Sequence, residues 1–564
     1  METGTVSTAA VQTVKGNVLT LYTGEEAWAL LSKESFLSDW DGLYDTCPWA
    51  TFFQSRIFVT TWYKVYRTKY LPIIVAAEYG GKLTGLLTFA IVLSNTKKGR
   101  IVGAGQFEAE YQSWLTEPSE SDNFIKAALL KVQQQFPRSP IHLRYVTSQA
   151  SLQWTKEPYW AQRCVLEPYG RPLMYMSDPE VDKIFRKSEF RKKRNRLQKK
   201  GKVEFERITT KEGFEAIWDD MMVMYDFRQG AKFNLAQFQN EPLKSAFYLA
   251  LFEQGQLHVT ALKVNGQLLA ATAIMSTRDW MHLQGINIHV PFNADYYSPG
   301  LVHFIMLGQM LASDGVAVLD LTPGGDFYKD RLATRHDEVN EVVISSSYYY
   351  RLKRKLRQRY FERLRKAGKW PMGTMLAMRK KAYLLKARTR QIIKQGLLKS
   401  MIGKVRNVIN PTKDKMYVID AGVLNNSIEK FPVNKDSLRD MLCYEVKGAH
   451  ATRWEFLEDA MIRFEKGGSA YSFSEDGRLL GCAWVKVDAK TSEDTNSNTE
   501  STIILQNLYC HPLGWNRLQF FLETVVQAVM KDQHAKCIYA QTQDVNMGKS
   551  LEAIGFRLTD KAME

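Results

Sequence analysis

A short strand that ends in a Pro-Gly-Gly turn constrains this chain more than any other segment. Residues 316–321 form an apolar run rich in β-branched residues, which predicts a buried strand. Pro323 cannot donate a ladder hydrogen bond, and the glycines after it accept a positive φ, so the strand ends there. Asp326, Tyr328 and Lys329 follow at once. A carboxylate, a phenol and an amine at a strand end favour a site of chemistry, although a β-turn with solvated charges gives the same pattern.

The order of motifs around this strand resembles one family. A Tyr-Ser-Pro-Gly motif at 297–300 precedes a helix predicted over 301–313; Asp-Gly at 314–315, the strand, and Gly-Gly-Asp-Phe-Tyr-Lys at 324–329 follow. This order resembles the GNAT-related acyltransferases of bacterial cellulose and capsule loci, which are relatives of the Fem peptidyltransferases. The resemblance covers about residues 40–350. It implies an α/β fold of tandem GNAT-like halves, with acyl-CoA (acetyl-CoA) as co-substrate and no metal.

Length and patterning divide the chain into several units. At 564 residues it is too long for one core. We expect a first GNAT-like half at 17–175, a basic connecting helix at 176–202, a second half at 203–350, a basic amphipathic segment at 351–410 and a third GNAT-like domain at 411–564. The first two units are expected to form one body with a shared cleft. A polar connection at 491–502 should interrupt the third.

The candidate site residues come from both halves. In the turn, Asp326 would serve as base, Tyr328 as proton donor to the leaving sulfur, and Lys329 as a cation near phosphate or oxyanion. Asp320 ends an apolar strand and is either a perturbed carboxylate or a buried structural hydrogen-bonder. Glu110, beside Tyr111, is either a surface carboxylate or the acidic residue that the family often places beside Tyr.

Ser298, Pro299 and Gly300 are the candidate cofactor-binding residues. They open a helix, where backbone N–H groups attract phosphate, so we expect Lys329 and Tyr328 to point toward them. The turn lacks the usual Gly-rich signature, and coenzyme A is implied by the resemblance alone. Asn287 also stands where the family tends to carry Asp, which leaves that position without a base.

The net charge of +16 is concentrated in two segments. Residues 351–406 hold 20 Lys and Arg against the single acid Glu362, which leaves the rest of the chain near −3. Apolar residues recur there at intervals of four, which is typical of an interfacial helix. The segment either contacts an anionic membrane or packs on a domain with solvated charge; nucleic acid is a third alternative, without a matching fold signature. Residues 183–202 are either a solvated helix face or a clamp for phosphate.

The third unit departs from an active GNAT domain at two places. Residues 511–516 lack a Gly-rich pyrophosphate loop, and Leu551 stands where active members carry a general-acid Tyr. We therefore expect this unit to be non-catalytic.

Two functional hypotheses from different classes remain. The first is an N- or O-acyltransferase that acts on a sugar or a lipid-linked cell-envelope intermediate, with aminoacyl transfer from charged tRNA as a variant. The second is a non-catalytic, GNAT-derived assembly factor of exopolysaccharide synthesis. Six scattered cysteines without a C-x-x-C motif, no visible signal peptide and no apolar run of membrane-spanning length predict a cytoplasmic bacterial protein, with peripheral contact to the inner membrane face as a further expectation.

Overall fold

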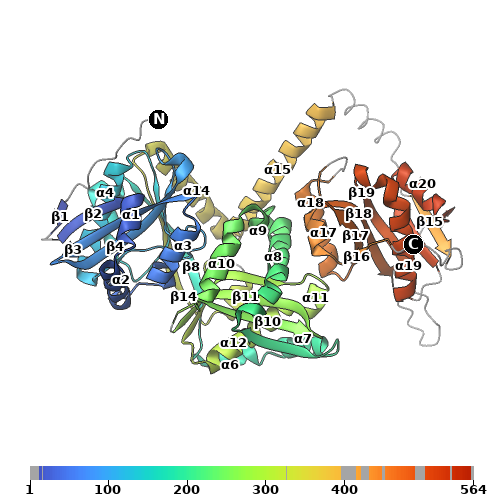
Figure 1. Cartoon of the computed structure of the whole chain (residues 1–564), viewed down its shortest axis with the longest axis horizontal. Coiled ribbons are helices and arrows are strands. Elements are labelled where there is room, and N and C mark those ends of the chain that lie inside the picture. The colour runs from blue at the N-terminus through green and yellow to red at the C-terminus, as the bar shows by residue number, and fades with distance from the viewer. Residues whose placement is uncertain are drawn as a thin grey trace.

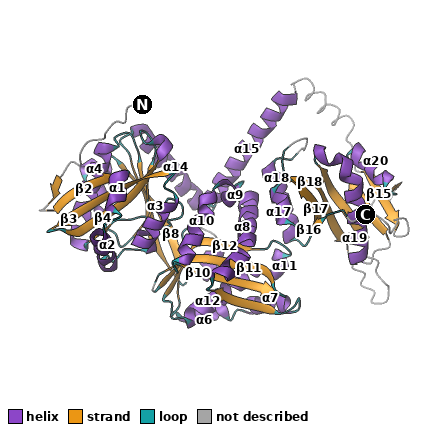
Figure 2. Ribbon diagram, viewed as in Figure 1, coloured by secondary structure: helices purple, strands orange, loops and turns teal. Residues whose placement is uncertain are grey.

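Fourteen strands of the described chain form one mixed sheet that runs through both halves of residues 12–344 (Figures 1 and 2). The structure is a computed structural model that describes residues 12–14, 17–277, 279–324, 327–395, 415–420, 431–446, 451–488, 502–533 and 537–559. The expected α/β fold class is confirmed. The polar connection predicted at 491–502 lies almost wholly outside the described residues.

The first half places helices around a strand meander. Its helices and strands are β1 (Gln12–Val14), β2 (Asn17–Thr23), α1 (Glu25–Leu30), α2 (Glu34–Thr46), α3 (Arg56–Val65), β3 (Tyr70–Tyr79), β4 (Lys82–Val92), β5 (Ile101–Gly103), β6 (Leu115–Thr116), α4 (Ser121–Gln135), β7 (Ile141–Thr147), α5 (Pro158–Ala161) and β8 (Cys164–Tyr175). The β3–β4 hairpin turns at Gly80 and Gly81, both with positive φ, as the Gly-Gly pair predicts.

The second half repeats this order. Two short helices, α6 (Pro179–Phe185) and α7 (Ser188–Gln198), replace the single connecting helix that the sequence predicts. Then come β9 (Val203–Ile208), α8 (Lys211–Phe233), α9 (Gln237–Asn240), α10 (Pro242–Glu253), β10 (Leu257–Val264), β11 (Gln267–Ser276), β12 (Trp280–His289), α11 (Ala294–Tyr297), α12 (Pro299–Ser313), β13 (Val318–Asp320), α13 (Phe327–Leu332) and β14 (Arg335–Ile344).

The two halves exchange strands at the centre of the sheet. The strand order β7-β14-β8-β13 places β14 of the second half between β7 and β8 of the first half. In turn, β8 pairs antiparallel with β13, with Asp320 opposite Leu173. The halves therefore share a continuous hydrogen-bonded interface, and β8 and β14 mark the junction in Figure 1.

The third unit is a separate seven-stranded sheet in the order β16-β17-β18-β19-β20-β15-β21. Two helices, α14 (Tyr348–Lys366) and α15 (Pro371–Gln395), precede it. It contains β15 (Lys415–Asp420), β16 (Asn434–Lys435), α17 (Leu438–Leu442), α18 (Arg453–Glu465), β17 (Ser469–Glu475), β18 (Arg478–Asp488), β19 (Thr502–Cys510), α19 (Leu518–Gln533), β20 (Cys537–Thr542), α20 (Val545–Ala553) and β21 (Arg557–Thr559).

The third unit docks on the second half through α18. The Trp454 indole donates to the Ala231 carbonyl of α8 at 3.1 Å, and Leu457 packs against Gly230. Leu551, which the sequence analysis singled out, is fully buried in the core of the third sheet.

Candidate active site

A hydrogen-bonded histidine and aspartate lie where β12 and β13 separate. The two strands pair in parallel only over Trp280–His282 and Val318–Asp320, and β12 then continues to His289 paired with β11 on its other edge. The register sets His282 beside Asp320, and their Nδ1 and Oδ2 atoms are 3.1 Å apart. Both side chains are buried, at 2% and 0% exposure. Directly after His282, residues 283 and 284 bulge out of the pairing with β11.

The surroundings of Asp320 keep it ionised. Burial raises its pKa, but the hydrogen bond with His282 and the nearby Arg171 guanidinium outweigh burial and hold the pKa below its usual value. The Thr322 N–H also donates to Asp320 at 2.8 Å. Because an ionised carboxylate only accepts, His282 donates from Nδ1, and its Nε2 is left to accept a proton. Thr322 itself has φ 63°, a strained conformation for a β-branched residue beside a site.

The first half contributes Tyr111 and Glu110 to this cluster. The Tyr111 ring lies 5.7 Å from the His282 ring, and its fully buried hydroxyl lies near the Asp320 carboxylate. Burial, together with the charge of Asp320, raises the pKa of Tyr111 well above its ordinary range, so the phenol is neutral. Glu110 is ion-paired with Arg144 at 3.1 Å, and burial raises its pKa although Arg144 and Lys329 oppose the shift.

A cleft of about 780 Å³ reaches this cluster from the junction of the halves. His282 and Arg171 lie among its lining residues. Aromatic rings line it together with carboxylates, amides and hydroxyls: Asp41, Tyr44, Asp45, Trp49, Thr51, Phe52, Thr147, Gln149, Gln256, Ser276, Thr277, Asp279 and Trp280. Arg171 is held in place by Asp337, whose Oδ1 accepts from Nε at 2.7 Å.

The turn residues predicted from the sequence are placed differently from expectation. Residues 327–332 form helix α13 and not a turn. Lys329 is buried, and its Nζ donates to the carbonyl and hydroxyl oxygens of Thr322 at 3.2 and 3.0 Å, so it faces the end of β13 and not the start of α12. Asp326 and the side chain of Tyr328 lie outside the described residues, and their roles stay predictions.

Ser298 and Gly300, but not Pro299, line a second pocket on the Leu283 side of β12. Its volume is about 330 Å³, and Leu283, Asn287 and His289 of β12 line it as well. Ser298 has φ 48°, and both Leu301 and Val302 donate their N–H to its carbonyl, so the helix start offers few free donors.

Basic helix α7 supplies positive charge next to this pocket. Lys193 Nζ donates to the Ser298 hydroxyl, and Arg196 donates to the Tyr296 carbonyl at 3.1 Å. Lys200 lies 5.7 Å from the centre of the Tyr297 ring. The basic connecting segment and the Ser-Pro-Gly turn, predicted separately as phosphate sites, therefore lie side by side.

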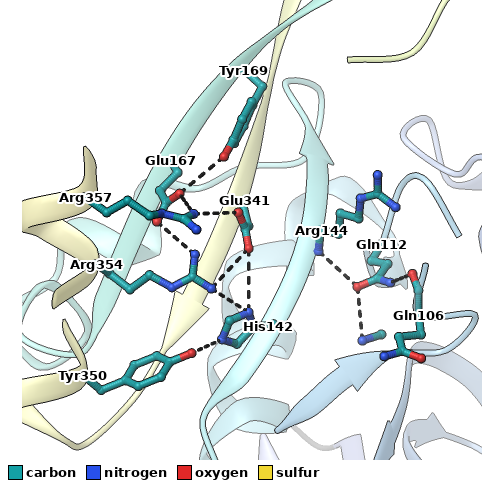
Figure 3. Close-up of polar contacts among 11 residues, drawn as sticks. Gln106, Gln112, His142, Arg144, Glu167, Tyr169, Glu341, Tyr350, Arg354 and Arg357 are labelled. Atoms are coloured by element: carbon teal, nitrogen blue, oxygen red, sulfur yellow. Dashed lines mark hydrogen bonds and ion pairs between the residues drawn. The ribbon is translucent and has the colours of Figure 1, made fainter. Parts of the chain in front are cut away.

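The equivalent opening in the first half is filled by Gln112. There β5 and β7 pair only over residues 101–102 and 141–142. The Gln112 carboxamide oxygen accepts from the N–H groups of Gly103 and Arg144 at 3.2 and 3.0 Å, and its amide donates to the Gln106 carbonyl at 2.8 Å (Figure 3). Because these N–H groups already have an acceptor, they could not bind an acyl group. The opening that remains available is the one between β12 and β13 in the second half.

Sequence reasoning found Asp320 but missed His282 and Arg171, and it named Tyr111 only as the neighbour of Glu110. His282 falls on the polar side of the alternation Met281-His282-Leu283-Gln284, so the local pattern does not distinguish it from a solvated residue. Arg171 on β8 reaches the site only through the strand exchange, so no local pattern marks it.

Known proteins resemble part of this chain. A family model described as an acetyltransferase (GNAT) domain matches residues 185–330, so the second half has a GNAT acetyltransferase fold. No curated protein matches the chain.

Solved structures with weak similarity include FemX, at 10% identity over 54% of this chain and 95% of that one, with a TM-score of 0.38. The DUF2156 domain of a putative lysylphosphatidylglycerol synthetase from Agrobacterium fabrum follows, at 12% identity over 55% and 91%, with a TM-score of 0.36. A tandem GNAT protein from the clavulanic acid biosynthesis pathway is similar at 12% identity over 58% and 99%, with a TM-score of 0.35.

Proposed function

We propose that this protein transfers an acyl group from an acyl thioester, acyl-CoA in the first place, to a hydroxyl or amine of a second substrate. The observation that carries the proposal is the His282–Asp320 pair at the point where β12 and β13 separate. The large cleft lies on the His282 side of β12, and the smaller pocket begins at the next residue, Leu283. Two substrates that enter from these two sides would meet beside the imidazole.

The acceptor proton goes to His282. Nε2 takes the proton from the acceptor hydroxyl or amine as its oxygen or nitrogen bonds to the thioester carbon, and Asp320 stabilises the imidazolium that forms. When the C–S bond breaks, the sulfur leaves as a thiolate, and the neutral Tyr111 hydroxyl near Asp320 donates the proton to it. The imidazolium returns its proton through solvent, which reprotonates Tyr111, so the site is restored.

The pocket at Ser298 suits the phosphate-bearing end of the donor. Lys193 contacts Ser298 directly, and the start of α12 adds the positive end of a helix dipole. Leu301 and Val302 donate their N–H groups to the Ser298 carbonyl and cannot bind a phosphate. The cations of α7 therefore supply most of the attraction for the phosphate-bearing end of the donor.

The cleft suits a glycan or a related cell-envelope acceptor. Aromatic faces such as Tyr44 and Trp280 can stack on the apolar faces of sugar rings, while the surrounding amides, carboxylates and hydroxyls can bind sugar hydroxyls. A sugar or exopolysaccharide intermediate is therefore the acceptor class that we propose to test first.

The test combines donor binding with turnover. Calorimetry with acetyl-CoA measures donor affinity, and release of free thiol with a panel of sugars, amino sugars and amines measures transfer. We expect His282→Gln and Asp320→Asn to lower kcat by about a hundredfold or more, the usual contribution of a general base. Tyr111→Phe should lower kcat while the ring packing and the donor Kd stay unchanged. His336→Gln is the matched control, because His336 forms an exposed pair with Asp330 at 3.2 Å in the same half.

The outcomes separate the proposal from its alternatives. Absence of acetyl-CoA binding by the wild-type protein would favour the non-catalytic assembly factor. Transfer from charged tRNA without transfer from acyl-CoA would favour the aminoacyl variant. Full turnover in His282→Gln would refute the base assigned here.

A further inference from the structure

One face of helix α14 packs against the sheet, and another face is exposed. On the inner face, the Tyr350 hydroxyl lies 2.7 Å from His142 Nε2, and Arg354 donates to Glu167 at 3.2 Å (Figure 3). Arg357 also pairs with Glu167, and Phe361 is buried. At 100° per residue these four side chains lie within one narrow sector of the helix.

The outward face carries an apolar stripe. Tyr349, Leu352, Leu356 and Tyr360 are exposed at 75, 38, 54 and 42%, respectively. Their spacing of three and four residues places them on a single ridge, turned away from the sheet-facing sector. Exposed apolar residues scattered singly need no explanation, but a continuous ridge marks an interaction surface.

Cations border the stripe. Exposed Lys355, Arg359, Arg363 and Lys366 lie along one side of it, and Glu362 is the only acid in α14. The helix as a whole is strongly basic. Helix α14 thus has one face packed on the sheet, a basic flank and an apolar ridge. This arrangement is typical of a helix that lies in a lipid–water interface.

Helix α15 extends the surface. One side of it contacts α18, where the Tyr383 and Trp454 rings are 5.5 Å apart and Lys380 pairs with Glu458, and the Tyr360 hydroxyl contacts the Met378 sulfur at 3.9 Å, which joins α15 to α14. Its exposed apolar side chains include Met378 at 58% and Leu385 at 69%, with exposed Arg379, Lys381 and Lys386 around them.

We propose that the outward face of α14 and α15 docks the protein on the surface of an anionic lipid bilayer. Within the described ranges, no helix combines the length and the apolar character needed to cross a bilayer. A lipid surface accepts both parts of this face, since headgroups attract the cations and the acyl boundary takes the Leu and Met side chains. A nucleic acid would satisfy the cations but leave the aliphatic ridge against phosphates.

Vesicle binding by the full chain tests the proposal. The probes are vesicles of phosphatidylglycerol and phosphatidylcholine in equal parts, pure phosphatidylcholine vesicles, and a structured RNA. Each cation near an anionic leaflet contributes about fivefold in affinity, so Lys355→Gln, Arg359→Gln and Arg363→Gln together should weaken binding about a hundredfold. The matched control replaces three exposed lysines of the first half by Gln: Lys33, Lys82 and Lys156.

The apolar ridge has its own test. Leu356→Gln with Tyr360→Gln should weaken binding to the mixed vesicles at least tenfold, whereas Phe520→Gln with Leu558→Gln, exposed at 52 and 56% on the third unit, should not. Binding should also fall with added salt. The proposal is overturned if the wild-type protein does not bind the mixed vesicles, if the ridge or charge variants match their controls, or if RNA binds and displaces the protein from lipid.

Discussion

At the scale of residues, three buried histidines of the second half have lowered pKa values. Burial, the largest cause, lowers the pKa of His258, His289 and His303 to about 4 each, with Arg207 and Arg228 opposing protonation of the first two. His303 contacts the Thr260 hydroxyl at 3.1 Å, and His289 lies against Gly300. These rings are therefore neutral at pH 7, and His289 and His303 line the candidate donor pocket without adding charge.

Their low pKa values make stability depend on pH. The unfolded chain binds protons at these positions near pH 6.5, whereas the folded chain does so only near pH 4. Between these values the unfolded state carries more protons, so the free energy of unfolding falls as the pH falls from 6.5 to 4, by up to about 1.4 kcal/mol per pH unit for each histidine. We expect His303→Gln to flatten this slope, measured by urea unfolding at several pH values. His336→Gln, at an exposed position, should leave the slope unchanged; an unaltered slope in His303→Gln would contradict the assignment.

At the scale of elements, the segment between β5 and β6 connects the two halves. Gln112 fixes the segment in the opening between β5 and β7 of the first half. Glu108 connects it to α10, because it accepts from Lys244 at 2.6 Å and from the Tyr248 hydroxyl at 3.0 Å. Gln284 of β12 donates to the Phe107 carbonyl at 2.9 Å. The segment thus crosses from one half to the other and sets Tyr111 beside His282.

Removing the anchor should affect chemistry more than donor binding. Gln112→Ala leaves the N–H groups of Gly103 and Arg144 without their acceptor, which costs about 1–3 kcal/mol in the free energy of unfolding. Because Tyr111 follows the loosened segment, we expect kcat to fall while the acetyl-CoA Kd, which depends on the second half, stays within a few-fold. Steady-state kinetics and calorimetry measure the two effects, with exposed Gln135→Ala as control. Equal kcat in both variants would show that the segment does not position Tyr111.

At the scale of the whole molecule, the third unit docks on the second half. Phe464 of α18 packs against Phe227 and Phe292, and its carbonyl accepts from Asn293 N–H at 2.8 Å, just before the Ser298 turn. Glu465 lines the donor pocket. The third unit is therefore in contact with the wall of the candidate donor site.

A larger side chain at the docking surface tests this contact. A Cβ at Gly230 would lie 2.8 Å from Leu457 Cδ1, so Gly230→Leu should separate α18 from α8, although Leu favours a helix by about 1 kcal/mol over Gly. We expect faster hydrogen exchange in α18 and an earlier unfolding transition of the third unit. Gly42→Leu is the control, because a Cβ there meets nothing within 4 Å. Unchanged exchange in α18 would show that the docking tolerates the added volume.

Much of the fold could be predicted from local pattern. The β10–β11 hairpin turns at Asn265 and Gly266 with φ 50° and 77°, as an Asn-Gly pair requires. Helix α12 begins two residues before the predicted range 301–313 and ends with it, because apolar periodicity is a local property. The exception is α13, a helix over residues 327–332, because the sequence places Tyr328 and Lys329 in the turn that follows the strand.

The sequence by itself determined the α/β class, the basic helices, the buried strand that ends at Asp320 and the Ser-Pro-Gly turn. Only the tertiary structure decided which groups meet. His282 and Asp320 come together through the parallel pairing of β12 with β13, Arg171 through the exchange of β8 into the second half, and Tyr111 through a segment anchored in the first. The physical reason is that strand pairing is non-local: the register that sets these side chains side by side is fixed by hydrogen bonds between strands, and no stretch of the sequence contains it.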